Sequence, residues 1–338
     1  MLNKAVINLN TIRKNAIKVK EKLNADCKFC AVVKADAYGH GAVKVANALY
    51  HLADYFAVAT VEEGMELRRS GIDKPVLILC TPVGSDYENV VRFNLTATID
   101  CAQNLTKLFK QCDLQGKRAS VHIKFNSGMN RQGVDGIDQL ETLIRLFDAD
   151  NGVDLEGMYS HLAFPQNKNS MMSAVNKFLL ANNCVKRYNS KAICHLSASG
   201  GFLQGLQFDM VRIGLLLYGY KPFESDYLSV DKAMRVYAPV LKERTITCGD
   251  VALYGDKKAN CGLDLTLVRY GYADGLMRSE IEGQFNNRCM DMTALIGKSN
   301  GTFQCVMDDA ELLAQRYHTI SYEILTKSAL KAEKIYVN

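Results

Sequence analysis

The sequence predicts an α/β protein: a (β/α)8 barrel over residues 1–231, followed by a mainly β domain over residues 232–338. Eight short apolar runs, typical of buried strands, alternate with helix-like segments over roughly the first 230 residues. After about Lys232 the pattern becomes alternating apolar and polar residues with turn signals. A length of 338 residues suits a barrel plus a smaller domain. A doubly wound open sheet is the competing architecture, because periodicity does not reveal whether a sheet closes.

The chain begins with a short alternating stretch around Val6 and Asn8, which predicts a strand. A basic amphipathic helix is expected from Asn10 to about Leu23. The eight strand-like runs then follow, at residues 29–34, 55–59, 75–79, 95–99, 121–125, 155–160, 192–196 and 210–213.

The helix after the second run has recognisable ends. Thr60 and Glu63 have the spacing of a capping box, and Gly71 stands where this helix should stop.

The C-terminal part has a different texture. Residues 236–251 and 265–272 alternate like strands, with turn signals at 248–250 and 254–256, and a helical segment at 308–316 precedes the tail. The N-terminal strand is a candidate to join this domain.

The composition is that of a soluble globular protein, with 48% hydrophobic and 23% charged residues. The net charge of +5 comes from interspersed acids and bases, so we expect no nucleic-acid partner. The start has no signal-peptide core, and the longest apolar run, 213–220, is interrupted by Gly214 and Gly219. We therefore expect a cytoplasmic protein without a membrane span.

Eleven cysteines occur without paired spacing, which favours free thiols in a reducing compartment. Cys27 and Cys30 form a single CxxC with no second pair, so no metal site is expected.

The first barrel strand leads into Lys34, followed by a turn with a tyrosine and two glycines. A lysine held at the end of a buried strand is partly desolvated, which lowers its pKa and makes a nucleophilic amine. Such an amine could bind an aldehyde cofactor, of which pyridoxal phosphate is the best known. The alternative is a lysine that caps the strand and reaches solvent.

Other polar residues follow later strands, where chemistry gathers in such barrels. Arg131 follows the fifth strand, His161 the sixth, Ser199-Gly200-Gly201 the seventh, and Arg212 belongs to the eighth. Each has an ordinary structural alternative: a core histidine, surface arginines, a plain loop. Their convergence at one mouth favours an anion-binding catalytic site.

Residues 31–41, AVVKADAYGHG, resemble the pyridoxal-phosphate attachment motif of the alanine racemases. The resemblance continues in order along nearly the whole chain. It is carried by FAVATVEE (56–63), SGMNRQG (127–133), SHLA (160–163), VRIG (211–214), YG (254–255), GYADG (271–275), MD (290–291) and TISYE (319–323).

The resemblance implies a barrel followed by a β domain, working as a head-to-tail homodimer with shared active sites. It implies that pyridoxal 5'-phosphate is held by Lys34, which serves one face of a small amino-acid substrate. Tyr254 from the partner's β domain would serve the opposite face. Two groups on opposite faces suit inversion of a stereocentre; a tyrosine, with an ordinary pKa near ~10, needs cationic neighbours to act as a base.

The remaining roles are implied in the same way. Arg212 would face the cofactor's ring nitrogen; related decarboxylases place an acid there. Arg131 would bind the substrate carboxylate and the cofactor's phenolic oxygen, and Met290 the substrate through its backbone N–H. His161 would stack beside the ring. The phosphate would be bound by Tyr38, Ser199, Gly214, Leu215 and Tyr322.

Several positions bear on the site's details. Lys124 matches a lysine that many relatives carry as a carbamate, and Tyr272, Ile320 and Tyr322 would narrow the entrance. Ala198 stands where relatives often have asparagine, and the stretch 292–308 is shortened.

The function predicted is an alanine racemase supplying D-alanine for peptidoglycan. The alternatives are a serine or broad-specificity racemase and a non-catalytic pyridoxal-phosphate carrier.

Overall fold

The computed structural model describes residues 1–149, 151–251, 253–254, 258–259, 262–277 and 288–338. The chain divides into two compact units. The barrel unit comprises Arg13–Ala35 and Ala42–Val230, and the β unit comprises Met1–Ile12, Asp36–Gly41 and Asp231–Asn338.

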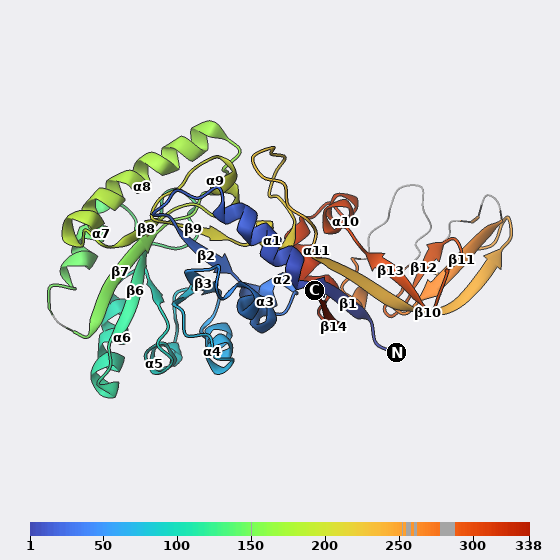
Figure 1. The fold of residues 1–338 in the computed structure, drawn as a ribbon, viewed down its shortest axis with the longest axis horizontal. Helices are drawn as coiled ribbons and strands as arrows, with labels where there is room; N and C mark the ends of the chain where they lie inside the picture. Colours follow the sequence, from blue (N-terminus) through green and yellow to red (C-terminus); the bar gives the residue numbers. More distant parts are fainter. Residues whose placement is uncertain (150, 252, 255–257, 260–261, 278–287) are drawn as a thin grey trace. The chain divides into compact units, whose positions relative to one another are not determined.

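The barrel unit is built on parallel strands (Figure 1). They pair as two four-stranded sheets in the orders β4-β3-β2-β9 and β5-β6-β7-β8. Single bridges, Leu77 to Thr96 and Ala198 to Arg212, join the two sheets at both seams. The predicted (β/α)8 barrel is therefore confirmed and the open sheet is excluded. The strands are β2 Lys28–Val32, β3 Tyr55–Val58, β4 Val76–Ile78, β5 Ala97–Ile99, β6 Ala119–Lys124, β7 Val153–Tyr159, β8 Ile193–His195 and β9 Met210–Ile213.

Helices cover the outside of these strands, as α6, α7 and α8 do in Figure 1. Each buries part of its apolar residues against the barrel, such as Leu105 and Leu108 of α6 and Leu140 of α7. The capping box of Thr60 and Glu63 is present at the start of α4, and Gly71 follows its end with φ +91°. The helices are α1 Leu9–Lys20, α3 Ala42–Leu49, α4 Val61–Arg69, α5 Asp86–Arg92, α6 Ala102–Gln115, α7 Ile137–Arg145, α8 Lys168–Tyr188, α9 Ser199–Leu203 and the 3₁₀ helix η1 Leu215–Tyr218.

The barrel interior is not purely apolar. Thr98, His122 and His195 are 0% exposed, and Arg212 is 3% exposed. Barrel interiors are usually filled by branched aliphatic side chains. Buried polar groups that replace them need partners, and they indicate a functional reason for their presence.

The β unit contains a sheet in the order β12-β11-β10-β1-β14, with β13 pairing β10. The N-terminal strand β1 pairs antiparallel with β10 and parallel with β14, so the expectation that it joins this part of the fold is confirmed. The strands are β1 Lys4–Asn8, β10 Met234–Ile246, β11 Leu263–Val268, β12 Thr293–Ile296, β13 Phe303–Met307 and β14 Glu333–Val337.

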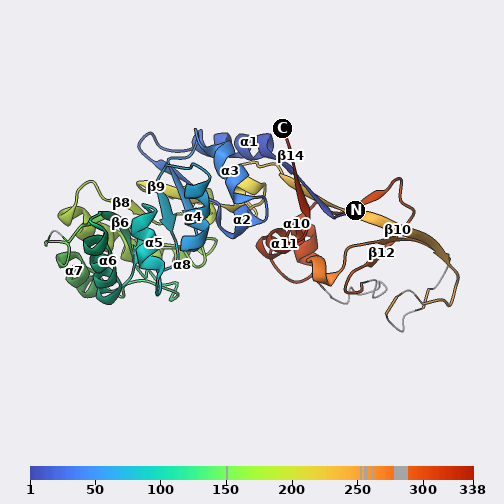
Figure 2. The same ribbon diagram turned by 90° about the horizontal axis from the view of Figure 1, so that it is seen from below.

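Two helices accompany this sheet and lie side by side, as Figure 2 shows. The helix expected at 308–316 is α10 Ala310–Arg316, capped by the Asp309 side chain. The second, α11 Ser321–Ser328, is not predicted by the sequence pattern, and its N-cap Ile320 provides no side-chain hydrogen bond. A 3₁₀ turn, η2, spans Tyr272–Asp274, while Gly255 and Asp256 of the expected turn lie outside the described residues.

The segment after β2 has an unusual backbone. The prediction that the strand ends on Lys34 is wrong. Strand β2 ends at Val32, and Lys34 begins the short helix α2, Lys34–Tyr38. Four successive residues of α2 have φ between +51° and +54°, which makes this a left-handed turn. Left-handed conformations cost L-residues roughly 1–2 kcal/mol each. The four residues are Ala35, Asp36, Ala37 and Tyr38. Because none of them is glycine, contacts with the surrounding structure must hold the turn in this conformation.

Candidate active site

Lys34 is partly buried at the mouth of the barrel unit. Burial lowers the pKa of its amine, and the charge of Arg131 lowers it further; Cys80 and Glu63 act in the opposite direction. A lowered pKa leaves more of the amine neutral, and the neutral amine is the form that is nucleophilic and basic.

Lys124 adds a second buried amine to the same mouth. It is 5% exposed, and its Nζ lies 4.0 Å from the ring centre of Tyr159. Burial, followed by the charges of Arg212 and Arg131, holds its pKa well below the ordinary value. Positive groups gathered in this way favour an anionic ligand between them.

Arg212 in β9 is held by several acceptors. Its Nη2 donates to the carbonyl of Ser160 at 2.7 Å and to that of Leu196 at 3.1 Å. Its Nη1 lies 2.5 Å from Nδ1 of His195. Burial lowers the pKa of Arg212 to about 10, so the guanidinium still carries its charge at neutral pH.

His161 follows β7 by two residues and is partly buried. Burial and the nearby cations, Arg212 foremost, hold its pKa well below the ordinary value, so its imidazole is neutral. Its Nδ1 lies 3.4 Å from Nη2 of Arg212. The predicted residues Lys34, His161 and Arg212 therefore interact within one unit.

The predicted phosphate-binding residues divide between the two units. In the barrel unit, Ser199 opens α9, and its Oγ accepts a hydrogen bond from the backbone N–H of Gly214 at 3.3 Å. Leu215 begins η1 directly after Gly214. Ala198, at the N-cap of α9, provides no side-chain hydrogen bond.

Tyr38 and Tyr322 belong to the β unit. Their ring centres lie 5.7 Å apart with the rings tilted by 42°. Burial raises the pKa of both phenols, so both remain protonated and can donate hydrogen bonds.

The predicted residues of the β unit's surface are open to solvent in the single chain. The Tyr254 side chain is 69% exposed and Met290 is 53% exposed. Tyr272 and Ile320 are 39% and 61% exposed. Large exposed apolar side chains are typical of interaction surfaces when they gather.

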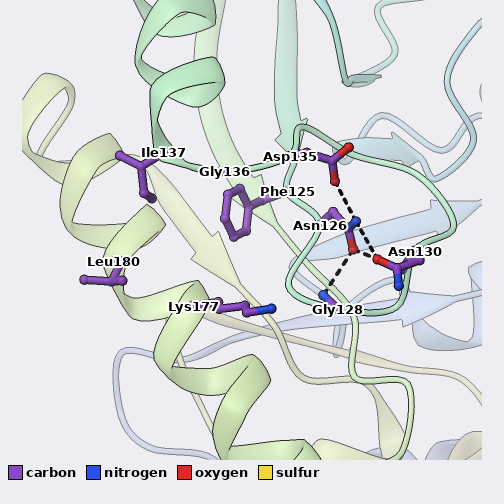
Figure 3. Close-up of a pocket in the computed structure, with 9 residues that line it drawn as sticks. All are labelled: Phe125, Asn126, Gly128, Asn130, Asp135, Gly136, Ile137, Lys177 and Leu180. Carbon is purple, nitrogen blue, oxygen red and sulfur yellow. Dashed lines mark hydrogen bonds between the residues drawn. The ribbon is translucent and has the colours of Figure 1, made fainter.

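Arg131 is exposed and lies on the loop between β6 and α7, which is organised by the side chain of Asn126 (Figure 3). The amide oxygen of Asn126 accepts from the backbone N–H groups of Gly128 and Asn130, and its Nδ2 donates to Asp135 at 2.7 Å. These bonds fix the loop next to Arg131. A hollow of about 320 Å³ beside it is lined by Phe125, Asn126, Gly128, Asn130, Asp135, Gly136, Ile137, Lys177 and Leu180.

Three polar residues of the barrel interior are not predicted from the sequence to belong to the site: His122, Glu156 and His195. His195 contacts Arg212 directly, and His122 contacts His195 through a 2.8 Å nitrogen–nitrogen approach. The available signal was the placement of histidines inside otherwise apolar strand-like runs.

The N-terminal part of the chain matches a known family. The model for "Alanine racemase, N-terminal domain" matches residues 7–222. The chain belongs to the alanine racemase family. The alanine racemase of Treponema denticola is 31% identical over 289 residues, covering 82% of this chain and 76% of the relative. That of Francisella tularensis subsp. novicida is 33% identical over 285 residues, covering 82% and 77%.

Solved alanine racemase structures share the fold over the whole chain. That of Clostridium difficile 630 has a TM-score of 0.92 at 29% identity, covering 100% of this chain and 96% of its own. That of Bacillus anthracis, with bound L-Ala-P, has 0.89 at 26%, covering 99% and 95%. That of Bartonella henselae contains covalently bound pyridoxal phosphate; it has 0.84 at 24%, covering 100% of both chains. Among the described residues, no helix is long and apolar enough to cross a membrane.

Proposed function

We propose that this enzyme interconverts L-alanine and D-alanine with pyridoxal 5'-phosphate, as a cytoplasmic homodimer, and supplies D-alanine for peptidoglycan. The observation that carries the proposal is the gathering of Lys34, Lys124, Arg131 and Arg212 around the neutral His161 in the barrel unit. Substrate and cofactor together carry a carboxylate, a phenolic oxygen and a phosphate, and this positively charged cluster is suited to bind such anionic groups.

The residues present fit the cofactor. Lys34 provides a partly desolvated amine of lowered pKa, as covalent attachment of an aldehyde requires. The Ser199 hydroxyl and the backbone N–H groups of Gly214 and Leu215 would donate to the phosphate in the barrel unit. Ser199 and Gly214 already lie together, joined by the bond from the Gly214 N–H to the Ser199 Oγ. The phenols of Tyr38 and Tyr322 are further donors. When bound, pyridoxal phosphate supplies an electron sink that makes the α-proton of an amino acid removable.

Lys34 moves the proton on one face of the substrate α-carbon, because it is the partly buried amine of lowered pKa that belongs to the cofactor-attachment motif. Tyr254 of a second copy moves the proton on the opposite face. Its exposure of 69% in the single chain supports this role, since a residue that completes another copy's site must be accessible before assembly. Met290, 53% exposed, offers its backbone N–H to the substrate from the same side.

Arg212 governs the ring nitrogen. A guanidinium has donors only and keeps its charge, so a nitrogen facing it stays unprotonated. Arg212 would thereby leave the ring a weaker electron sink than a carboxylate would, which suits brief removal and return of the proton. Arg131 would hold the substrate carboxylate through its planar donors, and His161 would stack beside the ring.

Two alternative functions make different predictions. A serine or broad-specificity racemase would need a wider entrance than the one that Tyr272, Ile320 and Tyr322 would form. A pyridoxal-phosphate carrier would bind the cofactor without turnover and would have no use for Tyr254 or Arg131.

The test is chiral product analysis with a panel of amino acids. The wild type should bind pyridoxal phosphate and interconvert the alanine enantiomers faster than those of serine. Lys34→Ala should lose covalent cofactor attachment and activity. Tyr254→Phe should keep the cofactor and lose proton removal from L-alanine; normal racemisation by Tyr254→Phe would refute the two-base assignment. Tyr50→Phe, which changes an exposed phenol of the barrel unit bonded to Asp73, is the matched control.

A further inference from the structure

A row of polar groups crosses the interior of the barrel unit on four neighbouring strands. Nη1 of Arg212 in β9 lies 2.5 Å from Nδ1 of His195 in β8. Nε2 of His195 lies 2.8 Å from Nδ1 of His122 in β6. Nε2 of His122 lies 3.4 Å from Oε2 of Glu156 in β7. Both imidazoles are 0% exposed.

The two ends of the row determine where every hydrogen lies. A guanidinium can only donate, so Nδ1 of His195 must accept and carries no hydrogen. Burial and the charge of Arg212 hold the pKa of His195 well below its ordinary value, so the ring is neutral and its one hydrogen is on Nε2. His195 therefore donates to Nδ1 of His122. Because Nδ1 of His122 accepts this hydrogen, the hydrogen of the His122 ring lies on Nε2, the nitrogen nearer to Glu156.

Glu156 is suited to be the accepting end. Burial acts to raise its pKa, but the nearby His122 and the hydrogen bonds from Tyr55 and Thr96 outweigh this and bring the pKa below its ordinary value. The Tyr55 hydroxyl donates to Oε1 at 2.7 Å, and the Thr96 hydroxyl donates to Oε2 at 3.2 Å. At neutral pH this residue is a carboxylate held in place by two hydroxyls.

Nε2 of His122 has no hydrogen-bond partner of normal length among the described residues. A buried donor left unsatisfied is destabilising. The 3.4 Å approach to the carboxylate is what compensates it, so His122 and Glu156 depend on one another.

We propose that His195, His122 and Glu156 are positioning residues for Arg212. The row is hydrogen-bonded in one direction from Arg212 to His122 and ends in the 3.4 Å contact between His122 and Glu156, whose carboxylate is the counter-charge of the buried guanidinium. The row fixes the side chain of Arg212 from the side away from the barrel mouth. It also lowers the positive potential of Arg212 at the mouth. This inference rests on the proposed function of Arg212 in the site. It adds the remote carboxylate as the group that balances the guanidinium.

The first measurement needs no variant and no turnover. Ring ¹⁵N NMR of the histidine-labelled full chain, which has six histidines, distinguishes the two neutral tautomers from the charged form. Resonances are assigned by their loss in His122→Gln and His195→Gln. We expect both rings to carry hydrogen on Nε2 and none on Nδ1 at about pH 8.5, well above the ordinary histidine pKa of ~6.5. A hydrogen on Nδ1 of His195, or a charged His195, overturns the proposal.

The second measurement uses Glu156→Gln, with Glu141→Gln as the matched control. Glu141 is a glutamate of the same unit that pairs with Arg187 at 3.4 Å. We expect Glu156→Gln to shift the ring resonances of both His122 and His195 and to change the absorption band of the bound cofactor. Its kcat should fall roughly tenfold, the loss of one hydrogen bond to a charged group. The KM for alanine should change little, because Arg131 holds the carboxylate.

The control should leave all four readouts unchanged. If Glu156→Gln moves only the His122 resonance and leaves His195, the absorption band and kcat as in Glu141→Gln, Glu156 does not act through the row. If Glu156→Gln does not fold, the tautomers of the wild type still decide. A wild type with the expected tautomers but no racemisation of alanine would refute the proposed function while leaving the row itself intact.

Discussion

Replacing Ala35 by glycine is expected to stabilise the protein, although glycine in a helix normally does the opposite. Ala35 has φ +51° in the left-handed turn α2, and its side chain is exposed. The left-handed conformation costs alanine roughly 1–2 kcal/mol and costs glycine almost nothing. Glycine also gives the unfolded chain more conformational freedom, which reduces this stabilisation by about 0.4–1 kcal/mol. Because no apolar contact is lost, the free energy of unfolding should rise by about 0.5–1 kcal/mol.

The assay is equilibrium urea unfolding of the cofactor-free protein, with Ala48→Gly as the control. Ala48 lies in the right-handed helix α3, where the same change should lower the free energy of unfolding by about 1 kcal/mol. The two variants should therefore move in opposite directions. A loss of stability in Ala35→Gly as large as that in Ala48→Gly would show that the left-handed turn stores no strain.

The same variant should bind the cofactor less well. The turn separates Lys34 from Tyr38, and its backbone is fixed by the bond from the Ala35 N–H to Glu63 at 2.6 Å and by that from the Gly41 N–H to the Asp36 carbonyl at 2.8 Å. Glycine makes this spacing more variable in the free protein, and the freedom must be lost on binding. A dissociation constant for pyridoxal phosphate equal to that of the wild type would contradict this part.

Three further outcomes are expected. Ala198→Asn should add a side-chain cap to α9 and raise the free energy of unfolding of the cofactor-free protein by about 0.5–2 kcal/mol. The melting temperature should therefore rise, and an unchanged melting temperature would contradict this prediction. Because the folded pKa of Lys124 is lowered, the unfolded chain binds more protons between that pKa and 10.5, so stability should rise with pH in this window; in Lys124→Met, urea unfolding at several pH values should show a smaller rise. Gly133→Ala should displace the loop that carries Arg131, because at φ +121° its Cβ would meet the Asn126 nitrogen at 2.8 Å; the KM for alanine should increase, and an unchanged KM would be inconsistent with the loop's role.

Much of the fold can be predicted because strands buried on both faces produce short, nearly continuous apolar runs. All eight runs of the first 230 residues correspond to strands of the barrel. The closure of these strands into a barrel cannot be predicted in this way. It depends on two single bridges, one of them between Ala198 and Arg212, and hydrophobic periodicity does not show which strands will be bridged. The helix α11 is missed because Ile320 gives no capping signal. The left-handed turn is missed because Ala35 to Tyr38 contain no glycine.

The candidate site divides in a similar way. The gathering of residues that follow strands, such as Lys34 and Arg131, can be predicted because a parallel barrel brings all strand ends to one mouth; their roles stay predictions. Residues within strands, such as His122 and Glu156, cannot, because the sequence does not say which buried neighbours will face each other. Their pairing depends on the stagger between strands, as in the register shift between Val121 and His122 opposite β7.

The position of β1 between β10 and β14 has a consequence for biosynthesis. More than 300 residues separate β1 from β14 along the chain, so during translation β1 is made long before the strand that covers its second edge. An uncovered edge strand can pair with other chains. During translation this hazard lasts until β14 emerges, and nascent chains stalled just before Glu333 should bind chaperones more strongly than chains that include β14.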